Sequence, residues 1–304
     1  MSLKKILSVL MAAGIVLCFG LVGCAQSEVA PQPPAQQEVT PEVPAAAPVK
    51  VEQPDPAPQP VPETEPALET EPEEMIPPYD FMLPAPETEA VDKEYFADAA
   101  FVGDSRTDGF MIYSGVGRGD NLTSNGLSIF RLETKKALKI GGEEYTLLEA
   151  LERKQYGKVY LCLGVNELGI YKDDAFYESY LSAIDAIRAA QPGAVIYIQG
   201  LIPLNEEEVM AKSGKEYLKN DHLRVYNELM FKAAQEKQVV FLDLYTAFAD
   251  ESGALPAGAS RDGVHLTKEY CIKWLEYLQT HTVDPAQLGL PETVAIEKEE
   301  NITQ

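Results

Sequence analysis

A serine beside an apolar run is the first residue in this chain whose setting suggests chemistry. Ser105 follows Gly103 and Asp104 at the end of the run Phe101-Val102, and a helical pattern begins directly after it. At such a strand-to-helix turn, the helix N-terminus offers backbone donors and a positive dipole end to an oxyanion. Taken alone, the same residues also fit an ordinary helix N-cap.

A histidine near the C-terminus could act as the base for this serine. His265 stands three residues after Asp262, in a turn before the last helical pattern. An aspartate at this spacing can accept the imidazole Nδ1 proton, which leaves Nε2 free to take a proton from a serine. Considered singly, the pair also fits a capping aspartate and a surface histidine. With Ser105 it predicts a Ser-His-Asp triad for two-step acyl transfer.

The order of these motifs resembles that of the SGNH (GDSL-type) hydrolases, from residue 101 to about residue 278. Gly-Asp-Ser and Asp-x-x-His are similar to the first and fifth blocks of that family, and Gly164-Val165-Asn166-Glu167 is similar to its GxND block. The resemblance implies a serine esterase without cofactor or metal. It also implies an oxyanion hole made by the amides of Ser105 and Gly126 and by the side chain of Asn166.

One residue departs from the family pattern, and several neighbours have alternative roles. Glu167 stands where the family usually has aspartate, which could alter the bonds that aim the preceding asparagine. Asp243, after the last apolar run, could be the acid of an α/β-hydrolase, but the GxSxG motif of that fold is missing. Arg106 and Arg261 flank the motifs and could hold an anionic substrate group.

The N-terminus is typical of a bacterial lipoprotein. Lys4 and Lys5 precede an apolar run at 6–21, and Leu21-Val22-Gly23-Cys24 resembles a lipobox. We therefore expect a signal peptide at 1–23, removed to leave lipidated Cys24, and an extracytoplasmic protein anchored to the cell membrane. An ordinary secretory peptide and a single-pass signal anchor are the alternatives.

Residues 24–90 have the composition of a disordered stalk rather than of a domain. They are rich in proline, glutamate, alanine and glutamine, so they cannot bury a core. The stalk also supplies much of the net charge of −23, which argues against nucleic acid as a partner. We expect the hydrolase domain at 91–283 and a C-terminal tail at 284–304.

Within the domain, short apolar runs alternate with helical patterns. The predicted strands are 100–103, 127–131, 158–163, 195–200 and 239–242, the predicted helices 147–154, 174–190, 221–236 and 267–279, and a small hairpin is predicted at 138–145. This alternation predicts a three-layer α/β/α doubly wound, flavodoxin-like fold with five parallel strands, whose ligands bind beyond the carboxyl ends of the strands. Cys162 and Cys271 are expected to be small buried hydrophobic residues.

The location of the enzyme points to its substrate class. A tethered esterase outside the membrane meets surface glycans first, so we expect it to hydrolyse O-acetyl esters on cell-wall or other surface polysaccharide. An O-acetyltransferase on the same glycans would use the same residues. A non-catalytic, tethered glycan-binding lipoprotein is a third possibility, and the sequence leaves the oligomeric state open.

Overall fold

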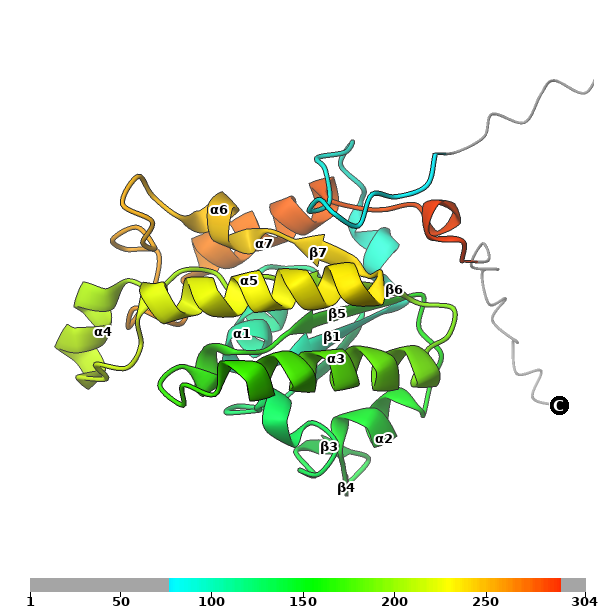
Figure 1. Cartoon of the computed structure of the whole chain (residues 1–304), viewed down its shortest axis with the longest axis horizontal. Helices are drawn as coiled ribbons and strands as arrows, with labels where there is room; N and C mark the ends of the chain where they lie inside the picture. Colours follow the sequence, from blue (N-terminus) through cyan, green and yellow to red (C-terminus); the bar gives the residue numbers. More distant parts are fainter. Residues whose placement is uncertain (1–76, 291–304) are drawn as a thin grey trace, which may run out of the picture. The chain divides into compact units, whose positions relative to one another are not determined.

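A computed structural model of the chain describes residues 77–290, which fold around a five-stranded parallel sheet (Figure 1). The strand order is β2-β1-β5-β6-β7, and every neighbouring pair is parallel. This order is that of a flavodoxin-like sheet, so the predicted doubly wound fold is confirmed. The strands are β1 Ala99–Gly103, β2 Asp120–Thr123, β5 Lys158–Cys162, β6 Val195–Gln199 and β7 Val240–Leu242.

Helices cover both faces of the sheet. In Figure 1, α3 and α5 lie side by side in front of it, while α1 and α7 pack together on the other face. The helices are α1 Ser105–Tyr113, α2 Leu147–Leu151, α3 Asp173–Ala190, α4 Glu206–Ser213, α5 Asn220–Lys237, α6 Leu244–Phe248 and α7 Lys268–Thr280. The four predicted helices are confirmed, and α4 and α6 are additional. Short 3-10 helices are η1 Lys93–Phe96, η2 Ile129–Arg131, η3 Val165–Glu167 and η4 Pro285–Leu288.

The second strand was predicted in the wrong place. Residues 127–131 form no strand, and η2 occupies their second half; β2 instead precedes them and pairs only with β1. Leu127 and Ile129 belong to an irregular segment, but both side chains are buried and the residues next to them are more exposed. This alternation has the two-residue period of a strand, so it led to a false strand prediction. The true strand escaped notice because Asp120 and Asn121 are poor strand formers. The hairpin is confirmed as β3 Leu138–Ile140 and β4 Glu143–Tyr145.

The folded unit extends beyond the expected domain boundaries. The amides of Ala85 and Thr88 donate to the carbonyls of Phe241 (2.9 Å) and Thr280 (2.6 Å), so residues 77–90 pack on the domain although their composition suggested stalk. At the other end, η4 contacts the same segment. The signal peptide and Cys24 lie outside the described residues. Within 77–290, no helix is both long enough and apolar enough to cross a membrane.

A ladder of aromatic rings fixes the strand that leads to Ser105. Phe101, Tyr160 and Tyr197 are register partners on β1, β5 and β6, and their rings stack with centroids 5.0 and 4.6 Å apart. Phe110 of α1 packs on Phe101 and, from its other side, on Trp274 of α7. These buried rings hold strand β1 and helix α1 in a fixed relation, so the turn between them is well positioned.

Candidate active site

Ser105, His265 and Asp262 come together beyond the carboxyl end of β1. The Ser105 hydroxyl lies 2.8 Å from Nε2 of His265, and Nδ1 of the same ring lies 2.8 Å from Oδ2 of Asp262. With Nδ1–H donating to the carboxylate, the neutral ring presents an unprotonated Nε2 that accepts from the serine. The geometry is that of a nucleophile, a base and an orienting acid.

Asp262 is held as an anion by its own turn. Its Oδ1 accepts from the backbone amides of Val264 (3.0 Å) and His265 (2.9 Å), in addition to the bond between Oδ2 and the imidazole. Partial burial would raise the pKa of Asp262, but the hydrogen bonds from His265 and Val264 outweigh it and lower the pKa below its usual value. The three-residue spacing therefore fixes both the charge and the aim of the carboxylate.

The turn that carries Ser105 is built from its two predecessors. Asp104 caps α1 by accepting from the amide of Arg106 at 2.9 Å, so Ser105 becomes the first residue of the helix. Gly103 is required by close approach, because a Cβ there would lie 2.1 Å from Oγ1 of Thr107 and 2.9 Å from the carbonyl oxygen of Cys162. Burial raises the pKa of Asp104 to about 6.

Asn166 lies close to the turn that carries Ser105, but its side-chain amide already forms hydrogen bonds within the protein. Nδ2 donates to Oδ2 of Asp104 (3.2 Å) and to the carbonyl of Leu127 (3.0 Å). Gly126 directly precedes the predicted strand 127–131, but the structure has no strand there. It is exposed in a turn after β2 with φ of +69°, and among residues 77–290 its amide has no hydrogen-bond acceptor.

Glu167 is a fully buried carboxylate that joins two loops. Its Oε1 accepts from the amide of Ile129 at 2.6 Å, while Oε2 has no partner among the described residues. Burial raises its pKa to about 7. Through this bond, and through the contact between Asn166 and Leu127, the loop after β5 holds the segment that follows Gly126.

The other flanking residues have structural contacts. Arg106 is buried, with its guanidinium donating to the carbonyl of Ile202 (2.8 Å), so it cannot meet a substrate as had been suggested. The guanidinium of Arg261 lies 4.6 Å above the ring of Tyr113 and outside the cavity lining. Asp243 caps α6 and does not contact the histidine of the triad.

A cavity of about 130 Å³ opens on the triad. It is lined by the three triad residues, Asn166, and a wall that sequence reasoning missed, the loop between α4 and α5. Nothing in the one-dimensional pattern marks this loop, because it follows no apolar run and carries no family motif. The lining residues are Ser105, Val165, Asn166, Ser213, Lys215, Tyr217, Leu218, Asp262, Val264 and His265.

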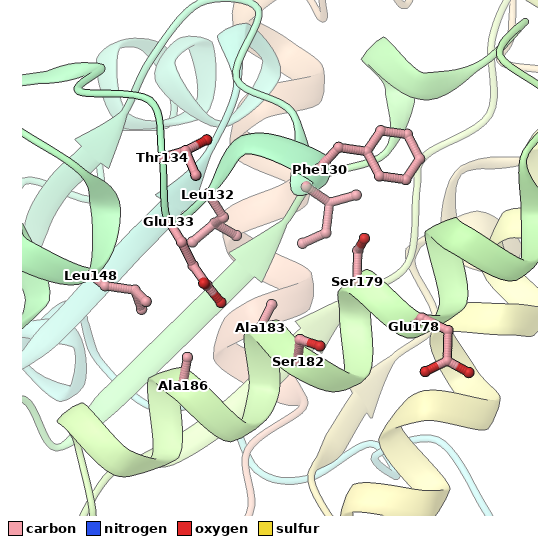
Figure 2. Close-up of a pocket in the computed structure, with 11 residues that line it drawn as sticks. Phe130, Leu132, Glu133, Thr134, Leu148, Glu178, Ser179, Ser182, Ala183 and Ala186 are labelled. Carbon is pink, nitrogen blue, oxygen red and sulfur yellow. The ribbon is translucent and has the colours of Figure 1, made fainter.

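A second, larger cavity of about 250 Å³ lies between η2 and α3 (Figure 2). It presents Ser179 and Ser182 from α3 and two carboxylates, Glu133 and Glu178. Of the described residues that line it, none is a histidine, so these serines have no base of the kind that faces Ser105.

The remaining histidines and cysteines are structural. His222 is buried, with Nε2 lying 2.9 Å from Asp173 and its ring stacked on Tyr171. Cys162 and Cys271 are buried, as predicted, and both are free thiols. Among residues 77–290, no group of three or more histidine, cysteine or acidic side chains is placed to hold a metal ion.

A flavodoxin-like sheet with a Ser-His-Asp constellation at its carboxyl edge defines a serine hydrolase that acts on ester bonds. The family model of the GDSL-like Lipase/Acylhydrolase family matches residues 101–269, which span the first strand to the last helix. The chain belongs to this family. No curated protein matches the sequence.

Solved structures with similar folds are distant in sequence. A GDSL-like lipase from Bacteroides thetaiotaomicron is 16% identical (61% of this chain and 88% of that chain covered, TM-score 0.45). An acetyl xylan esterase from Geobacillus stearothermophilus is 15% identical (67% and 99%, TM-score 0.44). A peptidoglycan O-acetylesterase is 17% identical (53% and 45%, TM-score 0.42). At this level of similarity they say nothing about the substrate of this chain.

Proposed function

We propose that this protein is a membrane-anchored esterase that removes O-acetyl groups from cell-wall or other surface polysaccharide. The observation that carries the acyl preference is the cavity at Ser105. Its volume of about 130 Å³ is well below the roughly 300–1,000 Å³ of pockets that enclose a drug-sized ligand. It has room for an acetyl group and part of a sugar, but not for a long acyl chain.

The proposed reaction follows from the contacts of the triad. Nε2 of His265 takes the hydroxyl proton as Oγ of Ser105 attacks the ester carbonyl, and Asp262 stabilises the imidazolium. The bond between the acetyl carbon and the sugar oxygen then breaks as the imidazolium protonates that oxygen, which releases the sugar as an alcohol and leaves an acetylated serine. Water, deprotonated by the same imidazole, attacks this ester, and the imidazolium returns the proton to Oγ as the acyl–oxygen bond breaks, which releases acetic acid and the free serine.

The negative charge of each tetrahedral intermediate is stabilised by the amides of Ser105 and Gly126 and by the side chain of Asn166. The first two are backbone donors without an acceptor in the described protein. The third must exchange one of its two internal bonds for the oxyanion, and the 3.2 Å contact to Asp104 is the longer one. Each donor of this kind is typically worth about a hundredfold to a thousandfold in rate.

Loss of the nucleophile tests the assignment. The purified protein should release acetate from acetylated glycan and react with a fluorophosphonate probe, and Ser105→Ala should abolish both. Ser182→Ala, in the cavity of Figure 2, is the matched control and should keep both. Full activity of Ser105→Ala would refute the assignment. Faster cleavage of long-chain than of acetyl esters would refute the acyl preference.

The anchor and the acyl acceptor need separate tests. Cys24→Ala should release the protein from the membrane fraction and abolish incorporation of radiolabelled palmitate. Adding an acetyl donor together with unacetylated glycan distinguishes hydrolysis from transfer, because transfer leaves acetylated glycan whereas hydrolysis yields acetate alone. A folded protein that binds glycan but reacts with neither ester nor probe would favour a binding lipoprotein.

A further inference from the structure

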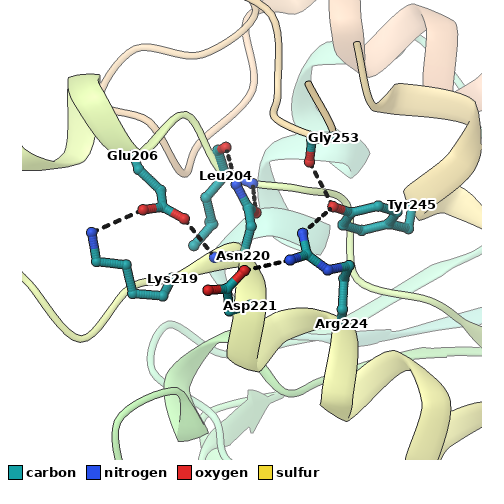
Figure 3. A network of polar contacts seen from close by, with 8 residues as sticks. All are labelled: Leu204, Glu206, Lys219, Asn220, Asp221, Arg224, Tyr245 and Gly253. Carbon is teal, nitrogen blue, oxygen red and sulfur yellow. Dashed lines mark hydrogen bonds and ion pairs between the residues drawn. The ribbon is translucent and has the colours of Figure 1, made fainter. Parts of the chain in front are cut away.

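The loop between α4 and α5 forms the outer wall of the catalytic cavity and is held firmly at its base. Glu206, at the start of α4, accepts from the ammonium of Lys219 and from the amide of Asn220, both at 2.8 Å (Figure 3). The Asn220 side chain in turn accepts a hydrogen bond from the amide of Leu204 and donates one to its carbonyl, both at 2.8 Å. The two ends of the wall are therefore joined, and the loop at 214–218 projects from a closed base.

The wall is also tied to the catalytic turn. The amide of Asn205 donates to the carbonyl of Gly263 at 3.0 Å, between Asp262 and His265 in the sequence. Gly263 lies so close to α4 that a Cβ on it would come within 2.4 Å of the Asn205 carbonyl oxygen. The backbone at the base of the loop thus keeps a fixed position relative to the turn that carries Asp262 and His265.

Tyr217 of this loop is a supported but exposed aromatic ring. It packs on Gly169, where a Cβ would lie only 2.7 Å from that of the tyrosine, and 43% of its surface remains accessible. Ile170 and Tyr171 are exposed beside that glycine in sequence. An aromatic ring fixed at the rim of a site gives an apolar face to a ligand at little entropic cost and keeps its hydroxyl in water.

Lys215 supplies charge to the same wall. Of the described residues that line the cavity, it alone carries a permanent positive charge, and within 77–290 it forms no ion pair. Such a group favours an anionic ligand.

We propose that Lys215 and Tyr217 form the subsite for the sugar that carries the ester, and that this sugar bears a carboxylate. The ring of Tyr217 packs against the pyranose, and the ammonium of Lys215 binds the carboxylate while the acetyl group occupies the cavity at Ser105. The subsite rests on the proposed esterase function. It gives to a lysine the anion-binding role that the sequence had suggested for Arg106 and Arg261.

A matched pair of substrates tests the charge preference. The methyl glycosides of mono-O-acetyl galacturonic acid and mono-O-acetyl galactose, acetylated at the same hydroxyl, differ only in a carboxylate against a hydroxymethyl group. The full-length protein should cleave the acid with about tenfold higher kcat/KM, through a lower KM. Lys215→Ala should reduce the preference to about one, and added salt should weaken it in the wild type because the ammonium is exposed.

Lys212→Ala is the control, because this lysine lies on α4 but does not line the cavity. It should keep the tenfold preference. Equal kcat/KM of the wild type for both glycosides, or an unchanged preference in Lys215→Ala, would overturn the role of the lysine.

The aromatic half of the subsite has its own readout. Tyr217→Ala should lower kcat/KM on both glycosides by the same factor, about tenfold, while reaction with the fluorophosphonate probe continues. Unchanged kcat/KM on both would overturn it. If the wild type cleaves p-nitrophenyl acetate but does not prefer the acidic glycoside, and Tyr217→Ala keeps full kcat/KM, the proposed subsite is wrong while the esterase assignment stands. If it cleaves no ester and takes no probe, the proposed function itself has failed.

Discussion

Replacing Glu167 by glutamine should remove much of the dependence of stability on pH. The carboxylate is fully buried, and its pKa rises from 4.5 to about 7 because it is removed from water. One pKa unit corresponds to about 1.4 kcal/mol, so ionising Glu167 costs about 3 kcal/mol more in the folded than in the unfolded chain. Glutamine has the same shape and keeps an acceptor for the amide of Ile129.

The sign follows from the direction of the shift. Since Glu167 keeps its proton to higher pH in the folded than in the unfolded chain, it does not oppose folding of the wild type below about pH 4.5. The free energy of unfolding of the wild type then falls as the pH rises through about 7. The free energy of unfolding of Glu167→Gln, minus that of the wild type, should therefore increase by about 3 kcal/mol between about pH 4 and about pH 9. Urea denaturation followed by circular dichroism measures it.

The exposed Glu251 provides the control, because Glu251→Gln should give a profile parallel to that of the wild type. A constant difference between Glu167→Gln and the wild type over the whole range would refute the reasoning. It would mean that the carboxylate reaches water, or finds a proton donor for Oε2, in solution.

Three further substitutions probe the site and its support. Asp262→Asn should keep the fold but lower kcat for acetate release by about 10⁴, since the imidazole loses its orienting anion. Gly169→Ala should lower the free energy of unfolding by about 2 kcal/mol in urea and raise KM, because φ is +90° and the new methyl meets Tyr217. Trp274→Phe should cost about 1–3 kcal/mol in thermal unfolding, since its indole N–H donates to a buried glutamine at 2.9 Å.

The fold and the triad could be predicted from the sequence because both depend on local patterns. Buried parallel strands are continuous apolar runs, and the acid and base of the triad share one turn, so their three-residue spacing together with Ser105 predicted that His265 and Asp262 interact. That this pair meets Ser105 was implied by the resemblance to the SGNH hydrolases, in which the serine block comes first and the Asp-x-x-His block last.

The cavity wall could not be predicted in this way. Lys215 and Tyr217 reach the site through bonds between residues far apart in sequence, such as Asn205 to Gly263, and only the folded chain brings these together. The suggested substrate-binding role of Arg106 was wrong for a related reason. It directly follows the nucleophile, but one step along a helix turns a side chain by about 100°, which points this one into the interior.

The misplaced second strand bears on the proposed oxyanion hole. Gly126 lies in a turn after β2, and its amide has no acceptor in the described protein. Two hydrogen bonds fix the segment that follows this turn: the Asn166 side chain donates to the carbonyl of Leu127, and the Glu167 carboxylate accepts from the amide of Ile129. An irregular segment held by these two hydrogen bonds can present a fixed donor that the fold leaves unused. The longer side chain of Glu167, where relatives usually have aspartate, provides one of these two hydrogen bonds, so the departure from the family pattern is compatible with an assembled site.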